Sequence, residues 1–404
     1  MTDPWRVHHY HYDEADNLLE ARQGVISPEH FHCDPAGNIS ESDAAVRHNR
    51  VTAFRNVRYQ YDDYGRVKER VLGGETQTME YDSFHRLAKV TCRSPQKQKP
   101  DRDIRYRYDA LGRRTEKRVE SYPPGTLRGL DAPEVSETRF VWEGLRLLSE
   151  TQDGRTRLYV YEDQSSYTPL VRVDGQGPNS RYRWYHCQPN GMPERLSDEK
   201  GNIRWESVTS AWGRTECESG DEDENLRFQG QYLDRETGLH YNLFRYYDPE
   251  CGRFTQPDPI GLRGGVNTYQ YAPNPFSWID PLGLSKTQDM VNEAHGQLDI
   301  GAQSRKTTAI GVDLNGNYYI ASNNDTVPRS QRIWAEKNGV TVINGVGHAE
   351  ETIMNNVPDI KHIDASRPVC IDCEDMMENK GGTTDTPMSG KKSRNRMGKG
   401  GCSV

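Results

Sequence analysis

A histidine and two cysteines near the carboxyl end of the 404-residue chain have the types and spacing of metal ligands. His348-Ala349-Glu350 is followed by Cys370 and Cys373, which form a Cys-x-x-Cys pair. Such a pair at a helix start directs both sulfurs to one point, and the helix dipole favours the thiolate that a metal requires. One imidazole and two thiolates leave the fourth position of a zinc ion open to water, beside which Glu350 can lie without binding the metal.

The same residues allow other interpretations. Cys-x-x-Cys alone is also typical of a redox pair or of half a structural zinc site, in which Cys402 or His362 would supply a fourth ligand. Six of the eight cysteines are scattered singly, which argues against a disulfide scaffold and indicates a reducing compartment. A domain that zinc only stabilises is therefore an alternative to a catalytic site.

Two aspartates form a second candidate site. Asp258 and Asp280 each begin an Asp-Pro-x-Gly sequence, in which Pro and Gly specify a tight turn that fixes the carboxylate. Two carboxylates held close together cannot both ionise easily, so one can act as a base on water while the other acts as an acid on an amide. A purely structural pair of turns is the alternative.

The elements that must position His348 and the cysteines follow a mixed α/β pattern. Alternating residues predict a strand at 310–314, and Asn315-Gly316 predicts a hairpin turn into a second strand. The further elements expected from the sequence are strands at 318–321, 340–343 and 360–363 and helices at 328–337, 349–355 and 370–378.

A Tyr-x-Tyr-Asp pattern, followed by a turn and Gly-Arg or a variant, recurs in the first part of the chain. Clear copies begin at Tyr59 and Tyr106, and weaker ones lie at Tyr10 and Tyr81. Residues alternate between the copies, and Gly, Asn and Asp occupy turn positions, which predicts a series of short antiparallel hairpins. A plain antiparallel sandwich is the alternative to a hollow wall.

The composition favours a thin wall over a thick core. Hydrophobic residues make up 33% of the chain with Tyr included, charged residues 28%, and the net charge is −8. This acidity argues against a protein that coats nucleic acid, but it permits an enzyme that handles nucleic acid locally. No apolar run reaches the ~18 residues of a membrane span. The amino terminus lacks the basic and apolar stretches of a signal peptide.

The Tyr-Asp pattern resembles the repeats of Rhs proteins over roughly residues 1–284. The resemblance implies an all-β YD-repeat shell fragment over 1–225 and a core-associated region with an aspartyl self-cleavage motif over 226–284. In that family the shell encloses a carboxy-terminal toxin, and the cut follows the last Leu of the motif. Asp258 and Asp280 would then cut the bond between Leu284 and Ser285. A complete shell is several times longer, so this chain resembles the distal end of a larger shell or a displaced carboxy-terminal cassette.

The His-x-Glu and Cys-x-x-Cys sequences resemble the signature of zinc-dependent nucleobase deaminases. The resemblance implies a small three-layer α-β-α domain over 285–404, in which His348, Cys370 and Cys373 bind zinc and Glu350 moves protons. It implies conversion of cytosine to uracil, with adenine to inosine as the other option. A basic tail at 380–404 and a weak candidate contact at Asn323 favour DNA or RNA over free nucleosides or nucleotides.

The two resemblances together predict a multi-domain antibacterial effector. It would be made in the cytoplasm without a signal peptide, delivered by a secretion machinery or the remaining Rhs shell, and active in the cytoplasm of a recipient cell. A producing cell must survive its own toxin, so a cognate immunity protein is an expected partner. The alternative is a structural or interaction protein with an inactive carboxy-terminal domain.

Overall fold

The computed structural model forms two compact units. The larger comprises residues 1–162, 167–259 and 266–283, and the smaller comprises residues 284–404 together with the short segments 163–166 and 260–265. Within the residues that are described, no helix is long and apolar enough to cross a membrane. The domain boundaries predicted at 225 and 284 stay predictions. The structure describes residues 8–366 and 373, 376 and 377, without 14–17, 24–27, 35, 41–43, 96–98, 127–129, 163–165, 189, 260, 262–266, 273, 277–279, 284–290, 292–293, 299, 304, 314–316 and 324–325.

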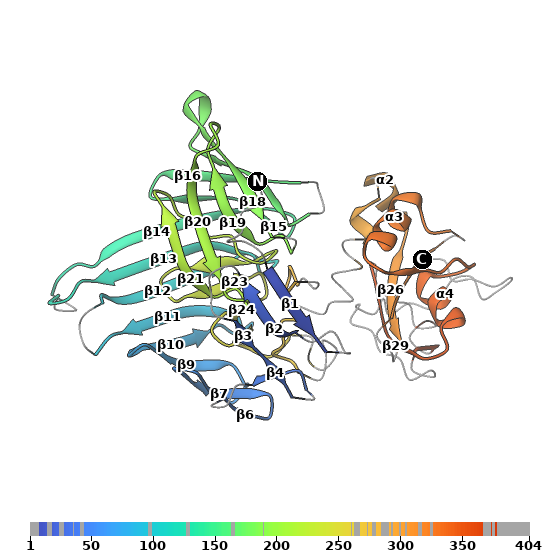
Figure 1. The fold of residues 1–404 in the computed structure, drawn as a ribbon, viewed down its shortest axis with the longest axis horizontal. Coiled ribbons are helices and arrows are strands. Elements are labelled where there is room, and N and C mark those ends of the chain that lie inside the picture. Colours follow the sequence, from blue (N-terminus) through green and yellow to red (C-terminus); the bar gives the residue numbers. More distant parts are fainter. Residues whose placement is uncertain are drawn as a thin grey trace. The chain divides into compact units, whose positions relative to one another are not determined.

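A single sheet of sixteen strands dominates the larger unit (Figure 1). Each strand pairs with the next one along the chain, so the sheet is a continuous meander, as short hairpins in series predict. Its strands are β6 (Ala45–Arg47), β7 (Arg50–Phe54), β8 (Val57–Tyr61), β9 (Val67–Leu72), β10 (Glu75–Tyr81), β11 (Leu87–Arg93), β12 (Asp101–Tyr108), β13 (Arg114–Tyr122), β14 (Glu134–Glu143), β15 (Arg146–Gln152), β16 (Arg155–Tyr161), β17 (Pro169–Asp174), β18 (Arg181–Cys187), β19 (Pro193–Ser197), β20 (Ile203–Thr209) and β21 (Thr215–Gly220).

In three of the Tyr-Asp repeats, the aspartate closes the hairpin turn that follows it. Asp62 Oδ1 accepts hydrogen bonds from the backbone N–H groups of Tyr64 and Arg66, both at 2.9 Å, and Asp62 Oδ2 accepts one from Arg66 Nε at 2.7 Å. The same three bonds form at Asp82 and Asp109 with their own arginines. The Asp and the Arg of the pattern are therefore two halves of one turn.

The tyrosine that ends the strand in four of the repeats joins that strand to an earlier one. Its hydroxyl donates to a backbone carbonyl of an earlier strand, from Tyr61 to Val51 (2.8 Å), Tyr81 to Val67 (2.8 Å), Tyr108 to Leu87 (2.7 Å) and Tyr161 to Leu147 (2.7 Å). The last of these belongs to a copy that we did not predict, Tyr159-Val160-Tyr161-Glu162, because Glu replaces the Asp. The repeated tyrosines thus act as cross-links along the wall.

Residues 226–283 pack on one face of this sheet and form a small sheet of their own. Its strands are β22 (Tyr232–Asp234), β23 (Leu239–Asn242), β24 (Arg245–Asp248) and β25 (Arg253–Phe254). Leu239, Tyr241 and Tyr246 share one hydrophobic cluster with Val57 and Ile104 of the large sheet. We call the sheet face that carries these residues the inner face. Three shorter strands, β1 (His8–Tyr12), β2 (Leu18–Gln23) and β3 (Glu29–His30), pair together, as do β4 (His32–Cys33) and β5 (Ile39–Ser40).

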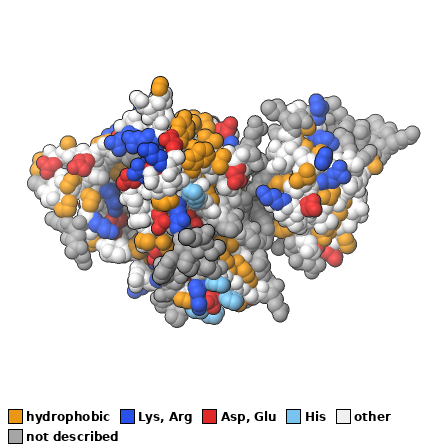
Figure 2. Space-filling view, turned by 45° about the horizontal axis from the view of Figure 1, so that its top comes forward, with side chains coloured by type: hydrophobic (Ala, Val, Ile, Leu, Met, Phe, Trp, Pro, Cys, Tyr) orange, Lys and Arg blue, Asp and Glu red, His pale blue; other side chains and the backbone are white. Residues whose placement is uncertain are grey.

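Buried ion pairs fix this segment to the inner face. Arg70 Nε lies 2.8 Å from Asp248 Oδ2, and Arg114 Nη1 lies 2.7 Å from Asp234 Oδ2. All four side chains are almost fully buried. Burial alone would lower the pKa of Arg70, but the carboxylate of Asp248 raises it. On the surface of the larger unit, by contrast, basic and acidic side chains are interspersed (Figure 2).

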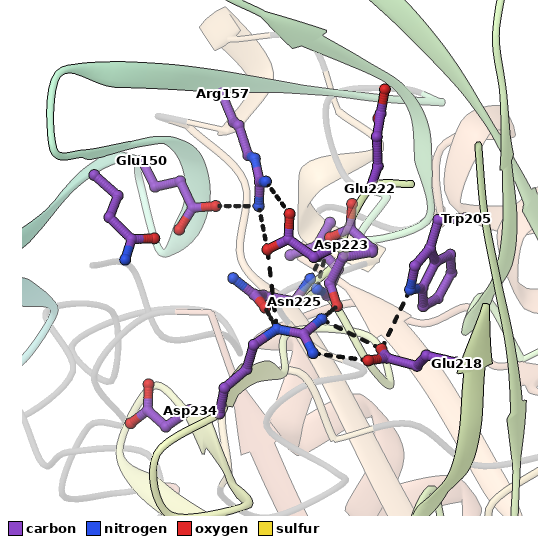
Figure 3. Close-up of polar contacts among 12 residues, drawn as sticks. Glu150, Arg157, Trp205, Glu218, Glu222, Asp223, Asn225 and Asp234 are labelled. Atoms are coloured by element: carbon purple, nitrogen blue, oxygen red, sulfur yellow. Dashed lines mark hydrogen bonds and ion pairs between the residues drawn. The ribbon is translucent and has the colours of Figure 1, made fainter. Parts of the chain in front are cut away.

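Residues 218–224, which begin within β21 and which we call the acidic segment, form ion pairs with arginines of the larger unit, and Figure 3 shows Asp223 beside Arg157. Arg172 and Arg183 lie opposite each other in the β17–β18 register, where two like charges repel. Glu222 contacts both, at 2.7 and 2.5 Å, and removes this repulsion. Further ion pairs of the segment join Asp223 to Arg157, Glu224 to Arg172, and Glu218 to Arg227 and Arg235.

The smaller unit has helices on both faces of a four-stranded sheet. Its elements are α2 (Ile300–Gln303), β26 (Thr308–Asp313), β27 (Tyr318–Ser322), α3 (Arg329–Lys337), β28 (Thr341–Val342), α4 (Ala349–Asn356) and β29 (Ile360–Ala365), with strand order β28-β27-β26-β29. Ile310 and Ile320 pack with Trp334 of α3, whereas Ala309 and Ala321 pack with Ile353 of α4.

The strands and the two complete helices predicted around the candidate metal site are present, and their ends differ from the predicted ones by at most two residues. The helix predicted at 370–378 is helical at its described residues, Cys373, Met376 and Met377. The hairpin turn at Asn315-Gly316 and the tail at 380–404 lie outside the described residues. The large antiparallel sheet confirms the mainly β part of the predicted fold.

The tyrosine cross-links predict a measurable loss of stability when one hydroxyl is removed. Tyr161→Phe leaves the partly buried ring in place but deletes the bond to the Leu147 carbonyl, so the free energy of unfolding should fall by about 1 kcal/mol. Tyr64→Phe is the control, because Tyr64 is exposed. Urea unfolding followed by tryptophan fluorescence tests this, and equal midpoints for the two variants would contradict it.

The acidic segment predicts a loss of stability in acid. Burial raises the pKa of Asp223, but its hydrogen bond with Arg157 and the charge of that arginine lower it overall, and Arg235 does the same for Glu218. A carboxylate whose pKa is lowered by folding stabilises the folded state at a pH above its unfolded-state pKa of about 4. This stabilisation is lost as the pH falls through the pKa of the folded state. The double variant Glu218→Gln, Asp223→Asn should be less stable than the wild type at pH 7, with the gap closing towards pH 3.

The exposed turn variant Glu199→Gln should follow the wild-type curve at every pH, which separates this network from a general effect of net charge. Urea midpoints measured between about pH 7 and 3 give the comparison. A gap between the double variant and the wild type that stays constant with pH would refute the prediction.

Candidate functional site

Both predicted aspartates lie at one guanidinium group in the larger unit. Asp258 and Asp280 are only 6% and 3% exposed. Arg245 Nη2 lies 2.9 Å from Asp258 Oδ2 and 3.4 Å from Asp280 Oδ2. The two Asp-Pro-x-Gly turns therefore bring their carboxylates together in a buried site. Their catalytic roles stay predictions.

Arg245 is a site residue that sequence reasoning missed. It lies at the start of β24, and its guanidinium stacks on the Phe254 ring with 3.6 Å between Cζ and the ring centre. Arg245 Nε donates to the Gly283 carbonyl at 2.5 Å, and Nη1 donates to the Thr268 carbonyl at 3.1 Å. One side chain thus holds both carboxylates and the backbone next to the predicted cleavage bond. The sequence shows this arginine among 52 basic residues and gives no signal that singles it out.

The turn that begins at Asp280 is held by backbone contacts. Asn242 Nδ2 donates to the Asp280 carbonyl at 2.8 Å, and Phe244 N donates to the Leu282 carbonyl at 3.2 Å. Gly283 has φ +70°, and a Cβ there would come within 2.7 Å of the Asn242 carbonyl, so only glycine fits. Leu284 and Ser285, between which cleavage is predicted, lie outside the described residues.

The second candidate site lies at the amino end of α4 in the smaller unit. His348, Glu350 and Cys373 offer ligand atoms that all lie within 4.8 Å of one another. His348 Nδ1 lies 3.3 Å from Cys373 Sγ, and all three side chains are buried. The structure therefore brings together three of the four residues that the sequence singled out. Cys370 lies outside the described residues.

The local sequence explains this convergence. Gly347 has φ +119°, which lets the chain turn into α4, and His348 remains extended as the residue that precedes the helix. Glu350 is in the first turn, where the helix dipole favours a carboxylate. Ala349 and Ile353 pack in the same cluster as Cys373, so the hydrophobic face of α4 also fixes the thiol.

The donor set fits zinc. Imidazole nitrogen and thiolate sulfur are the ligands that zinc prefers, and a carboxylate within 4.8 Å can either bind it or contact a bound water. A structural site would use Glu350 or another residue as a fourth ligand, whereas a catalytic site would keep that position open. The His362 side chain and Cys402, the alternative ligands, lie outside the described residues.

Asn323, the weak candidate for a substrate contact, has a structural partner. Its Oδ1 accepts a hydrogen bond from Thr307 N at 2.9 Å, and its backbone N donates to the Thr307 carbonyl at 3.1 Å. The residue therefore ties together the segments before β26 and after β27. Its role towards a substrate stays a prediction.

Comparisons with known proteins give family matches in the larger unit. Residues 3–124 match the teneurin YD-shell model, and residues 183–218 match the RHS protein model. The solved structure titled TcdB2-TccC3-TEV has a TM-score of 0.45 at 18% identity, and the match covers 69% of this chain and 17% of that one.

Three curated relatives share similar parts of the chain. "Double-stranded DNA deaminase toxin A" of Burkholderia cenocepacia is 35% identical, and the match covers 70% of this chain and 22% of that protein. "Toxin protein Tse5" of Pseudomonas aeruginosa is 33% identical, with 68% and 23% covered. "Probable deoxyribonuclease RhsA" of Dickeya dadantii is 31% identical, with 65% and 18% covered. The chain spans about a fifth of the length of these relatives.

Proposed function

We infer that the chain is part of an Rhs polymorphic toxin, because it matches the YD-shell and RHS family models and is similar to Rhs toxins. We propose that its residues 285–404 are a zinc-dependent nucleobase deaminase, freed by aspartyl self-cleavage after Leu284. The observation that carries the proposal is the buried cluster of His348, Glu350 and Cys373.

The activity is argued from these residues because the names of the relatives differ. A relative named as a deaminase matches 70% of the chain, and one named as a probable deoxyribonuclease matches 65%. Similarity of this extent does not separate the two activities. The cluster of His348, Glu350 and Cys373, together with a sequence that has both His-x-Glu and Cys-x-x-Cys, supports deamination, since such a set activates water beside a carboxylate.

His348, Cys370 and Cys373 would hold the zinc in this proposal. Zinc bound there would lower the pKa of a water molecule towards ~7. Glu350 would take a proton from the attacking water, pass it to the ring nitrogen of the base and then assist the loss of ammonia. For cytosine, water adds at C4 and the bond to the exocyclic nitrogen breaks, which gives uracil. Burial of Glu350 keeps bulk water away from this proton transfer.

The aspartyl pair supports a separate hydrolysis that releases the toxin. One carboxylate takes a proton from water, which attacks the Leu284 carbonyl, while the other protonates the Ser285 nitrogen as the peptide bond breaks. Arg245 positions both carboxylates, and its positive charge balances one of their two negative charges. The Gly283 carbonyl that Arg245 holds is one residue before this bond.

The biological setting follows from the proposed reaction. A deaminase that acts on DNA or RNA harms any cell that contains it, so the producing cell needs a cognate immunity protein. The effector would be made in the cytoplasm, delivered by a secretion machinery or the rest of the Rhs shell, and active in the recipient cytoplasm. Nucleic acid is its substrate and cytosine its preferred base.

A structural function is the second candidate, because Glu350 lies close enough to His348 and Cys373 to be a fourth zinc ligand. The smaller unit would then be an interaction domain that zinc stabilises. The two functions differ in whether loss of the Glu350 carboxylate removes activity or removes the metal.

The deaminase proposal predicts that Glu350→Gln keeps zinc but loses activity. Loss of a general acid and base should slow cytosine deamination by about 10² to 10⁴. Glu351→Gln, the neighbouring acid, should deaminate like the wild type. Uracil formation in oligonucleotides and zinc content per chain give the two readouts. Loss of zinc from Glu350→Gln would instead favour the structural function.

The self-cleavage proposal predicts that the purified chain splits into fragments that end at Leu284 and begin at Ser285. Asp280→Asn should abolish the split, since an amide cannot exchange the required proton. Asp63→Asn, which changes an exposed turn of the shell, should still split. Gel electrophoresis and mass spectrometry of the new termini measure this. An intact wild-type chain, or a split Asp280→Asn chain, would rule out the aspartyl mechanism.

A further inference from the structure

The smaller unit uses its basic residues differently from the larger one. In the larger unit, arginines such as Arg70, Arg114 and Arg172 form ion pairs with carboxylates. In the smaller unit, five basic side chains are described, and none forms an ion pair with another described residue: Arg305, Lys306, Arg329, Arg332 and Lys337. Four of them are exposed and Lys306 is half-buried. Figure 2 shows basic side chains gathered on the visible face of this unit, with few acidic ones among them.

The topology places three of these cations at one end of the sheet. Arg305 and Lys306 come directly before β26, whose first residue Thr308 pairs with Ser322 at the end of β27. Because β28 runs parallel to β27, α3 must return along the sheet to connect them. Arg329, its first residue, therefore lies at the carboxyl ends of β27 and β28, and Lys337 lies about 12 Å away at the other end of the helix.

The buried cluster lies at this same end. His348 follows β28 by six residues, and β28 ends beside β27. Val327 N donates to Asn344 Oδ1 at 3.0 Å, which ties the segment before Arg329 to the segment that leads into His348. The bonds between Thr307 and Asn323 tie the segment that carries Lys306 to the segment between β27 and Arg329. Hydrogen bonds thus connect the segments that carry Lys306 and Arg329 to the segment that leads into His348.

We propose that Arg305, Lys306 and Arg329 form a phosphate-binding edge that holds a polynucleotide while one base enters the site of His348 and Glu350. Exposed cations that have no carboxylate partner bind phosphates favourably, because their binding releases the counterions held by the phosphates. A free nucleoside has no phosphate and cannot use this edge. The inference rests on the proposed deaminase function and adds to it the surface that recognises the polynucleotide.

Binding without chemistry tests the edge. In full-length Glu350→Gln protein, binding to a labelled cytosine-containing DNA oligonucleotide is measured by fluorescence anisotropy between about 50 and 200 mM salt. Adding Lys306→Gln and Arg329→Gln should weaken binding and reduce the slope of log affinity against log salt by about 0.7 to 0.9 for each lost contact. Adding Lys337→Gln, the matched cation at the far end of α3, should change neither.

Activity then separates the edge from the chemistry. With Glu350 intact, Lys306→Gln together with Arg329→Gln should deaminate the oligonucleotide more slowly and free cytidine at the wild-type rate. An unchanged salt slope, or an equal loss in Lys337→Gln, would overturn the edge. A wild-type chain that deaminates neither substrate, but whose salt slope still depends on Lys306 and Arg329, would refute the deaminase function and leave the binding edge standing.

Discussion

The buried arginine–carboxylate pairs of the inner face are the interaction on which the larger unit depends. Arg70 with Asp248 and Arg114 with Asp234 each join the large sheet to the segment over 226–283. Removing two charges from water is costly, and breaking such a pair leaves one charge buried and uncompensated. A shift of the segment along the sheet would break both pairs together. The pairs therefore select one position of the segment, whatever they add to net stability.

The position of this segment on the large sheet determines which residues surround Arg245. Arg245 and Asp248 are at the two ends of β24, so the pair between Arg70 and Asp248 fixes the strand that presents Arg245 to Asp258 and Asp280. The stacking on Phe254 and the bond to the Gly283 carbonyl then fix the guanidinium itself. A proton transfer between two carboxylates needs such fixed geometry, because a displacement of about 1 Å can cost two orders of magnitude in rate. The large sheet is thus also the support of the proposed cleavage site.

The sequence predicted local features well and long-range pairs poorly. Hairpins and turns follow from Tyr, Asp, Gly and Arg within a few residues, and the site of His348 and Glu350 follows from a short motif at a helix start. The copy at Tyr159 was missed because Glu stands in place of the Asp. Arg245 was missed because its role depends on residues 13 and 35 positions later, Asp258 and Asp280, that only the folded chain brings to one nitrogen atom. The contacts of the acidic segment could not be predicted for the same reason, because the sequence around Glu222 does not indicate which of the many arginines it contacts.

The two units differ in what their charges are available to do. A sheet of sixteen strands with arginines on its inner face must neutralise them, and carboxylates from the segment over 222–248 do so. Cations that are paired in this way have little affinity left for phosphates, because a phosphate would have to displace a carboxylate already in place. The smaller unit builds its core from two apolar clusters on either side of its sheet, so the described cations are not needed for folding. A domain that holds itself together without its cations can present them to a ligand, and this difference in packing is the physical reason to look for substrate binding in the smaller unit.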